Sequence, residues 1–108
     1  MIIITGSVTG TPETIDELLA ASLKHVRRSR EEPGCISHAV HRDMENPLRL
    51  VFFEQWESPE AVRAHFAVPA SGQFVRNATA LAASPPTLEL FTATPASLVD
   101  NGLDGEIA

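Results

Sequence analysis

Residues 35–66 read CISHAVHRDMENPLRLVFFEQWESPEAVRAHF. The two ends of the segment 35–56 are apolar-rich, and the Asp, Asn and Pro residues between them favour a turn. This pattern predicts a β-hairpin over 35–41 and 48–56. Ser58-Pro59-Glu60 then combines an N-cap hydroxyl, a proline suited to the first helical position and an acid at the positive end of a helix. A helix is expected to begin there.

The same helix-start pattern occurs near the N-terminus, as Thr11-Pro12-Glu13. It follows an apolar, β-branched segment at 2–8 that predicts a strand. Apolar residues at helical spacing, among them Ile15, Leu19 and Val26, predict a helix that ends before Pro33.

Pro69 is expected to divide the second helical region into two short helices, since proline lacks the backbone N–H that a helix interior needs. Alternating leucines predict a last strand over 87–93. The resulting order β-α-β-β-α-β predicts an α+β, ferredoxin-like fold.

Length and composition are those of a single domain, which we expect to cover residues 1–95. Residues 96–108 are expected to form a tail that is disordered or strapped onto a partner subunit. A net charge of −6 argues against nucleic acid or an anionic membrane as a partner. The lone Cys35 and the lack of a secretory signal predict a cytoplasmic protein.

The strand at 48–56 carries large apolar side chains on both faces, with Phe52 and Trp56 on one and Val51 and Phe53 on the other. A ferredoxin-like sheet has helices on one face only, so its other face needs a different cover. We therefore expect a homodimer in which two sheets pack against each other.

Three segments carry a resemblance to a known family: Glu32-Pro33-Gly34-Cys35, the strand end Glu54-Gln55-Trp56-Glu57-Ser58, and the helix 61–66 with His65. Together they resemble the antibiotic biosynthesis monooxygenase family. The resemblance implies a dimeric α+β barrel with a small apolar or aromatic ligand between sheet and helices, and no cofactor. Its members include cofactor-free oxygenases of quinols and anthrones, haem-degrading enzymes and a sugar-phosphate isomerase.

The resemblance places the Trp56 side of its strand toward the ligand. Candidate bases are His65 and His38, because histidine titrates near neutrality. The expected substrate-binding residues are Trp56, Phe52, Glu54, Val40, Phe66 and Phe74. Other interpretations stay open: His65 as a surface or interface histidine, His38 as a hydrogen-bonded core residue, and Glu54 as a structural partner of His38, Arg49, Arg63 or Arg76.

No metal site is predicted, because His38 and His41 point to opposite faces of one strand and His25 stands alone on an arginine-rich helix. Cys35 is expected to be a small buried hydrophobe. The leading hypothesis is a cofactor-independent monooxygenase of a small aromatic, quinol- or anthrone-like compound. The alternatives are a non-catalytic binding dimer and a sugar-phosphate isomerase, for which Arg63 and Arg76 would be the phosphate anchors.

Overall fold

A computed structural model describes residues 1–98 of the chain, and its elements follow the predicted order. They are β1 (Ile2–Thr9), α1 (Ile15–Ser29), β2 (Cys35–Arg42), β3 (Arg49–Trp56), α2 (Pro59–Ala67), α3 (Pro69–Leu81) and β4 (Thr87–Thr92). The predicted β-α-β-β-α-β order is confirmed, with the second helical region divided into α2 and α3.

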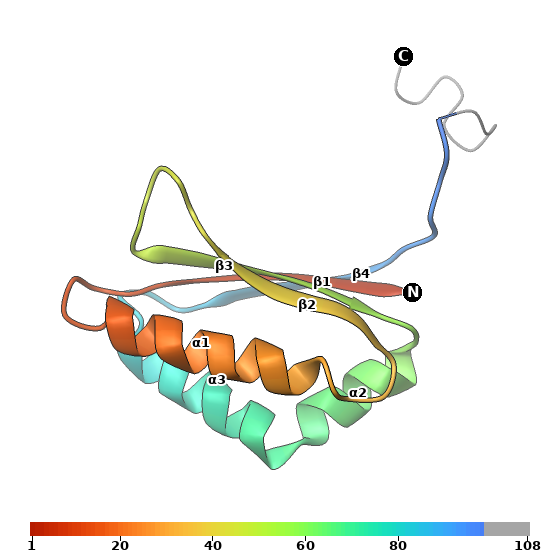
Figure 1. The fold of residues 1–108 in the computed structure, drawn as a ribbon, viewed down its shortest axis with the longest axis horizontal. Helices are drawn as coiled ribbons and strands as arrows, with labels where there is room; N and C mark the ends of the chain where they lie inside the picture. Colours follow the sequence, from red (N-terminus) through yellow and green to blue (C-terminus); the bar gives the residue numbers. More distant parts are fainter. Residues whose placement is uncertain (99–108) are drawn as a thin grey trace.

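The four strands form one antiparallel sheet in the order β2-β3-β1-β4. Figure 1 shows the three helices together on one face of this sheet. The two outer strands are therefore not neighbours in sequence, and each half of the chain contributes one central and one outer strand. This is the ferredoxin-like α+β arrangement that the sequence predicts.

The helix starts differ in detail from one another. Ser58 caps α2, since its hydroxyl accepts the Ala61 amide, and Pro59 is the first helical residue, as predicted. Val68 is extended, as expected before a proline, which separates α2 from α3. The first helix begins at Ile15 rather than directly after Thr11, because Thr11 first closes a turn onto the Thr14 amide.

The apolar core lies between the sheet and the helices in two clusters, one around Leu18, Leu50 and Phe52 and one around Ile4 and Trp56. The apolar periodicity of the sequence predicted Leu19 as a core position, but it is Leu18 that is fully buried. Burial of a leucine stabilises the fold by about 1.5–3 kcal/mol. Cys35 packs beside the second cluster, where burial raises the pKa of its thiol, as suits a hydrophobe better than a nucleophile.

The buried face of α1 is more polar than its sequence pattern suggested. Besides Leu18 and Val26, it buries Ser22, His25 and Ser29. Ser29 donates its hydroxyl hydrogen to the His25 carbonyl at 2.8 Å. The face that packs on the sheet thus brings a histidine into the interior.

A β-bulge interrupts β2 near its start. The pairing with β3 passes from Cys35 directly to Ser37, which leaves Ile36 as the extra residue with half its surface exposed. Simple alternation would place Ile36 on the same face as His38. The bulge removes Ile36 from that face and aligns His38 opposite Glu54 on β3.

None of the helices among residues 1–98 is long and apolar enough to cross a membrane. The expected tail at 96–108 falls almost entirely outside the described residues.

We expect Gly34→Ala to destabilise the fold by about 1–3 kcal/mol, as measured by urea unfolding. Gly34 has a φ of 83°, and a Cβ there would lie 2.5 Å from the Cβ of Ala61 on α2. Gly72→Ala is the matched control, since that position on α3 has room for a methyl group and the change should stabilise by about 0.5–1 kcal/mol. Equal unfolding midpoints for the two variants would contradict this account.

Candidate functional site

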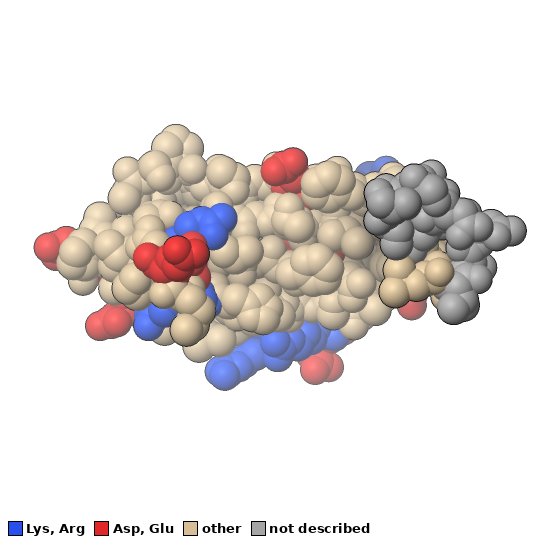
Figure 2. All heavy atoms as spheres, turned by 90° about the horizontal axis from the view of Figure 1, so that it is seen from above, with Lys and Arg blue, Asp and Glu red and all other residues tan. Residues whose placement is uncertain are grey.

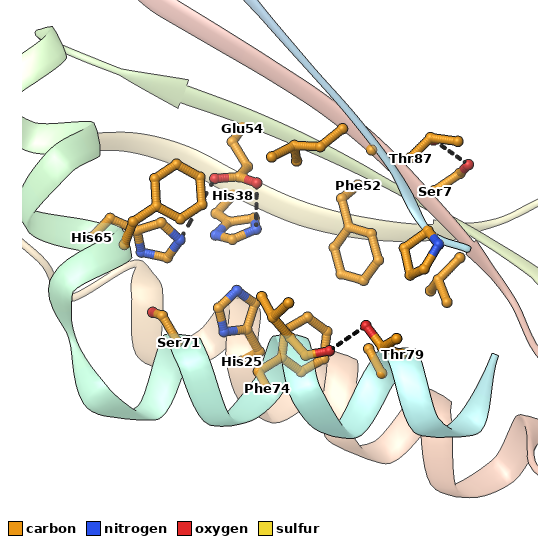
Figure 3. A pocket seen from close by; sticks show the side chains of 17 residues that line it. Ser7, His25, His38, Phe52, Glu54, His65, Ser71, Phe74, Thr79 and Thr87 are labelled. Atoms are coloured by element: carbon orange, nitrogen blue, oxygen red, sulfur yellow. Dashed lines mark hydrogen bonds and ion pairs between the residues drawn. The ribbon is translucent and has the colours of Figure 1, made fainter. Parts of the chain in front are cut away.

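A cavity of about 270 Å³ lies between the sheet and the helices, just below the usual range of about 300–1,000 Å³ for ligand pockets. Figure 3 shows its two ends, with His38, Glu54 and His65 at one and Ser7 and Thr87 at the other. Phe52 and Phe74 stand between them with ring centroids 5.9 Å apart. The cavity is therefore a mostly apolar slot with a polar cluster at one end.

Of the eight residues predicted for the site, six line this cavity: His38, Phe52, Glu54, His65, Phe66 and Phe74. Trp56 and Val40 do not. Trp56 is fully buried beneath the cluster and Val40 packs against the main core. Trp56 therefore acts on the cavity through the groups that it contacts.

His65 on α2 forms a short hydrogen bond with a carboxylate. Its Nδ1 lies 2.7 Å from Oε1 of Glu32, which stands in the turn after α1. With the Nδ1 hydrogen donated to Glu32, Nε2 is the nitrogen that carries the lone pair when the ring is neutral, and this nitrogen lies 3.9 Å from Oε1 of Glu54. The ring is 2% exposed and packs on Trp56 at 4.6 Å. Its orientation is thus set from both sides.

Glu54 on β3 is a buried carboxylate between the other polar groups. The Trp56 indole N–H donates to its Oε1 at 2.9 Å, and its Oε2 lies 3.5 Å from Nε2 of His38. His38 is one of the partners anticipated from sequence, whereas Arg49, Arg63 and Arg76 contact Asp43, Glu60 and Gln73 instead. Neither ring nitrogen of His38 makes a hydrogen bond within the described part of the chain.

The sequence predicted that His25 stands alone, and this prediction was wrong. His25 lines the cavity together with His38 and His65. Its ring stacks on Phe74, nearly parallel at 4.1 Å, and lies 5.2 Å from the His38 ring and 5.5 Å from the His65 ring. Arg28 Nη2 donates to its Nδ1 at 2.7 Å and to the Ser71 hydroxyl at 3.2 Å. Because a guanidinium can only donate, the proton of neutral His25 sits on Nε2.

Burial controls protonation in this cluster. It lowers the pKa of His25 to about 3, with His38 and Arg28 as further causes, and lowers the pKa of His38 to about 3, with His65 and Arg30 as further causes. Burial also raises the pKa of Glu54, against the opposing effect of the Trp56 hydrogen bond. His25 and His38 are accordingly neutral at pH 7.

His25, His38 and His65 each offer a nitrogen, and the three atoms lie within 4.8 Å of one another. Three imidazoles are a donor set suited to a divalent transition metal. The Arg28 contact works against such binding, however, since it leaves the proton on Nε2 of His25 and adds a positive charge behind the ring. The arrangement favours proton chemistry over metal coordination.

Sequence reasoning missed His25, Arg28, Glu32 and Ser71. The signal for His25 is its spacing: it lies seven residues after Leu18 and three after Ser22, on one helical face. Glu32 belongs to the turn that carries the family resemblance, but this resemblance assigned it no role at the site. Arg28 lies three residues after His25 on the same helix, a spacing that allows contact, whereas no local sequence pattern pairs Glu32 with His65.

Comparison with known proteins gives a consistent result. Residues 1–77 match the family model described as antibiotic biosynthesis monooxygenase. The uncharacterised protein sll1783 of Synechocystis is 31% identical over 90 residues, which are 83% of this chain. The match spans 61% of that relative's length.

Solved structures show the same fold. One described as an antibiotic biosynthesis monooxygenase is 27% identical, with a TM-score of 0.81 over 88% of this chain and all of that chain. A candidate member from Deinococcus radiodurans is 22% identical, with a TM-score of 0.86 over 93% of this chain and 99% of that one.

We expect the free energy of unfolding to decrease as the pH falls from about 6.5 toward 3. The unfolded chain takes up protons on His25 and His38 in this range while the native state does not, a loss of up to about 1.4 kcal/mol per pH unit for each histidine. Glu54 opposes this, because its raised pKa makes its contribution more favourable on acidification.

The measurement is the urea midpoint at pH 7.5 and 5.5 for the wild type and His38→Asn. The variant should lose part of the pH dependence, whereas His41→Asn, which changes an exposed histidine on the other face of β2, should keep all of it. A full pH dependence in His38→Asn would show that this ring is not held neutral.

Proposed function

The chain belongs to the antibiotic biosynthesis monooxygenase family, and from this premise we propose that it is an oxygenase for a small aromatic, quinol- or anthrone-like compound that works without flavin or metal. The cavity supports such a substrate by its size and by the rings of Phe52 and Phe74, which line it and could pack against a flat apolar molecule. What the reaction requires of the protein is a dry cavity and a base.

The observation that carries the proposal is the Glu32–His65 pair. A carboxylate bound to one imidazole nitrogen orients the ring and stabilises the positive charge that forms when the other nitrogen accepts a proton. His65 has this arrangement, with Glu32 at 2.7 Å from Nδ1 and Nε2 on the side of Glu54. We assign His65 as the base, and His38, neither of whose ring nitrogens makes a hydrogen bond within residues 1–98, as a second group that contacts the substrate.

The reaction then needs only substrate and dioxygen. Removal of a proton gives a delocalised anion, which passes one electron to O₂. The two radicals combine as a peroxide anion, which takes the proton back from His65 to become a hydroperoxide, and loss of water leaves a carbonyl group. For an anthrone, CH₂ becomes C=O: one oxygen atom enters the product, the other leaves as water, and all four electrons come from the substrate.

A sugar-phosphate isomerase is less well supported by the charges at the site. Its anchors were expected to be Arg63 and Arg76, but both are exposed and neither lines the main cavity. Arg63 contacts Glu60, and Arg76 contacts Gln73. A non-catalytic binding protein would use the same cavity and differs only in the absence of turnover.

We expect oxygen uptake with quinols or anthrones that persists with a metal chelator and without flavin. His65→Ala should lower it by about 10²–10⁴-fold, the usual contribution of a positioned base, and Glu32→Gln should also lower it, because the ring loses the carboxylate that orients it. Glu31→Gln, at the exposed neighbouring acid, should leave the rate unchanged. Ligand binding seen as Trp56 fluorescence quenching, with no uptake for any compound, would instead identify a binding protein.

We also propose that the protein forms a homodimer through the sheet face opposite the helices. Figure 2 looks onto this face and shows uncharged residues over most of it. Phe53, 39% exposed, pairs there with Thr5 on β1 and Ala39 on β2. A second sheet would cover these side chains and remove apolar surface from water.

Phe53→Lys is expected to convert the dimer into a monomer, because it places a charge at the centre of the proposed interface. Sedimentation velocity at micromolar concentration measures this directly. Met44→Lys, in the exposed hairpin loop, is the control and should sediment as the wild type. A monomeric wild type would refute the proposed assembly.

A further inference from the structure

Arg28 places a positive charge beside the cavity without a counter-ion. Its side chain is half-buried, its Nε is buried without a hydrogen-bond partner, and its Nη2 is directed to neutral acceptors, His25 and Ser71. None of the ion pairs among residues 1–98 includes it. A partly desolvated charge of this kind is stabilised when an anion comes near.

His25 connects this charge to the cavity. Its Nδ1 is occupied by Arg28, so Nε2–H is the free donor, and Figure 3 shows a nitrogen of this ring directed toward His38 and His65. Stacking on Phe74 holds the ring plane. A donor polarised by a cation through its own ring binds an anionic oxygen better than a neutral one.

The donor and the base face the same space from different elements. His25 and Arg28 come from α1, His65 from α2, His38 from β2 and Glu54 from β3, and the His25 and His65 rings are 5.5 Å apart. Negative groups, Glu32 and Glu54, lie on the His65 side, and the positive group lies on the His25 side. When a proton moves from the substrate to His65, the negative charge left on the substrate would therefore be stabilised at His25.

We propose that His25 and Arg28 form an oxyanion-binding pair, in which His25 Nε2–H donates to the oxygen of a deprotonated phenol or enol and Arg28 is the positioning residue behind it. This inference rests on the proposed function and specifies its substrate: a flat monoanion with its negative charge spread over a ring. A phosphate would find only one N–H and two nearby carboxylates, so the pair is not a phosphate site.

The test uses 4-nitrophenol, whose phenolate is yellow and which titrates near neutrality. Absorbance titration of the protein-bound compound should show a lower pKa than that of the free compound. Arg28→Gln can keep a hydrogen bond to His25 but removes the charge, so it should raise the pKa of the bound phenol and weaken phenolate binding at least tenfold. His25→Phe keeps the ring stacked on Phe74 but loses the donor, and should have a similar effect.

Arg27→Gln, at the exposed neighbouring arginine, is the matched control and should behave as the wild type. Circular dichroism and thermal unfolding establish that each variant is folded. The proposal is overturned if 4-nitrophenol does not bind, if the bound phenol titrates at or above its free pKa, or if Arg28→Gln and Arg27→Gln bind the phenolate equally. Phenolate binding without oxygen uptake would contradict the oxygenase alone, whereas uptake unaffected by Arg28→Gln would contradict the pair alone.

Discussion

Three imidazole rings share one buried space, and each must be neutral or paired because the surroundings are too apolar for an isolated charge. The Glu32 carboxylate can only accept a hydrogen bond, so a proton lies on Nδ1 of His65. The Arg28 guanidinium can only donate, so Nδ1 of His25 is unprotonated and its proton lies on Nε2. In their neutral forms the two rings thus offer opposite hydrogen-bonding groups to the cavity, an acceptor lone pair on His65 and a donor N–H on His25. The chemistry that we propose follows from this difference.

The fold brings four elements together at the histidine cluster, which makes the different proton placement on His25 and His65 possible. The bulge at Ile36 aligns His38 with Glu54, and Trp56 supplies the hydrogen bond that holds the Glu54 carboxylate in the interior. The break between α2 and α3 at Pro69 places His65 and Ser71 on separate helices beside the same cluster.

The sequence was sufficient for the order of the elements because their signals are local: proline and hydroxyl pairs at helix starts, turn residues in the hairpin, and alternation in the strands. It was also sufficient to choose Glu54 and His38 as candidates, since polar residues on an apolar strand face are conspicuous, while the family resemblance identified His65. It did not reveal the Arg28–His25 and Glu32–His65 contacts. Helical periodicity weighs apolar side chains, so it did not identify His25 as a buried residue of this helix. The 33-residue separation between Glu32 and His65 is bridged only by tertiary packing.

The central claim is the placement of protons in the histidine cluster, and the most direct measurement is a long-range ¹H–¹⁵N correlation spectrum of the protein labelled with ¹⁵N-histidine at pH 7. The account predicts that His25 is neutral with its proton on Nε2 and that His65 carries a proton on Nδ1. Assignments follow from the His25→Phe and His65→Ala spectra. A His25 ring protonated on Nδ1, or a His65 ring whose only proton is on Nε2, would contradict it.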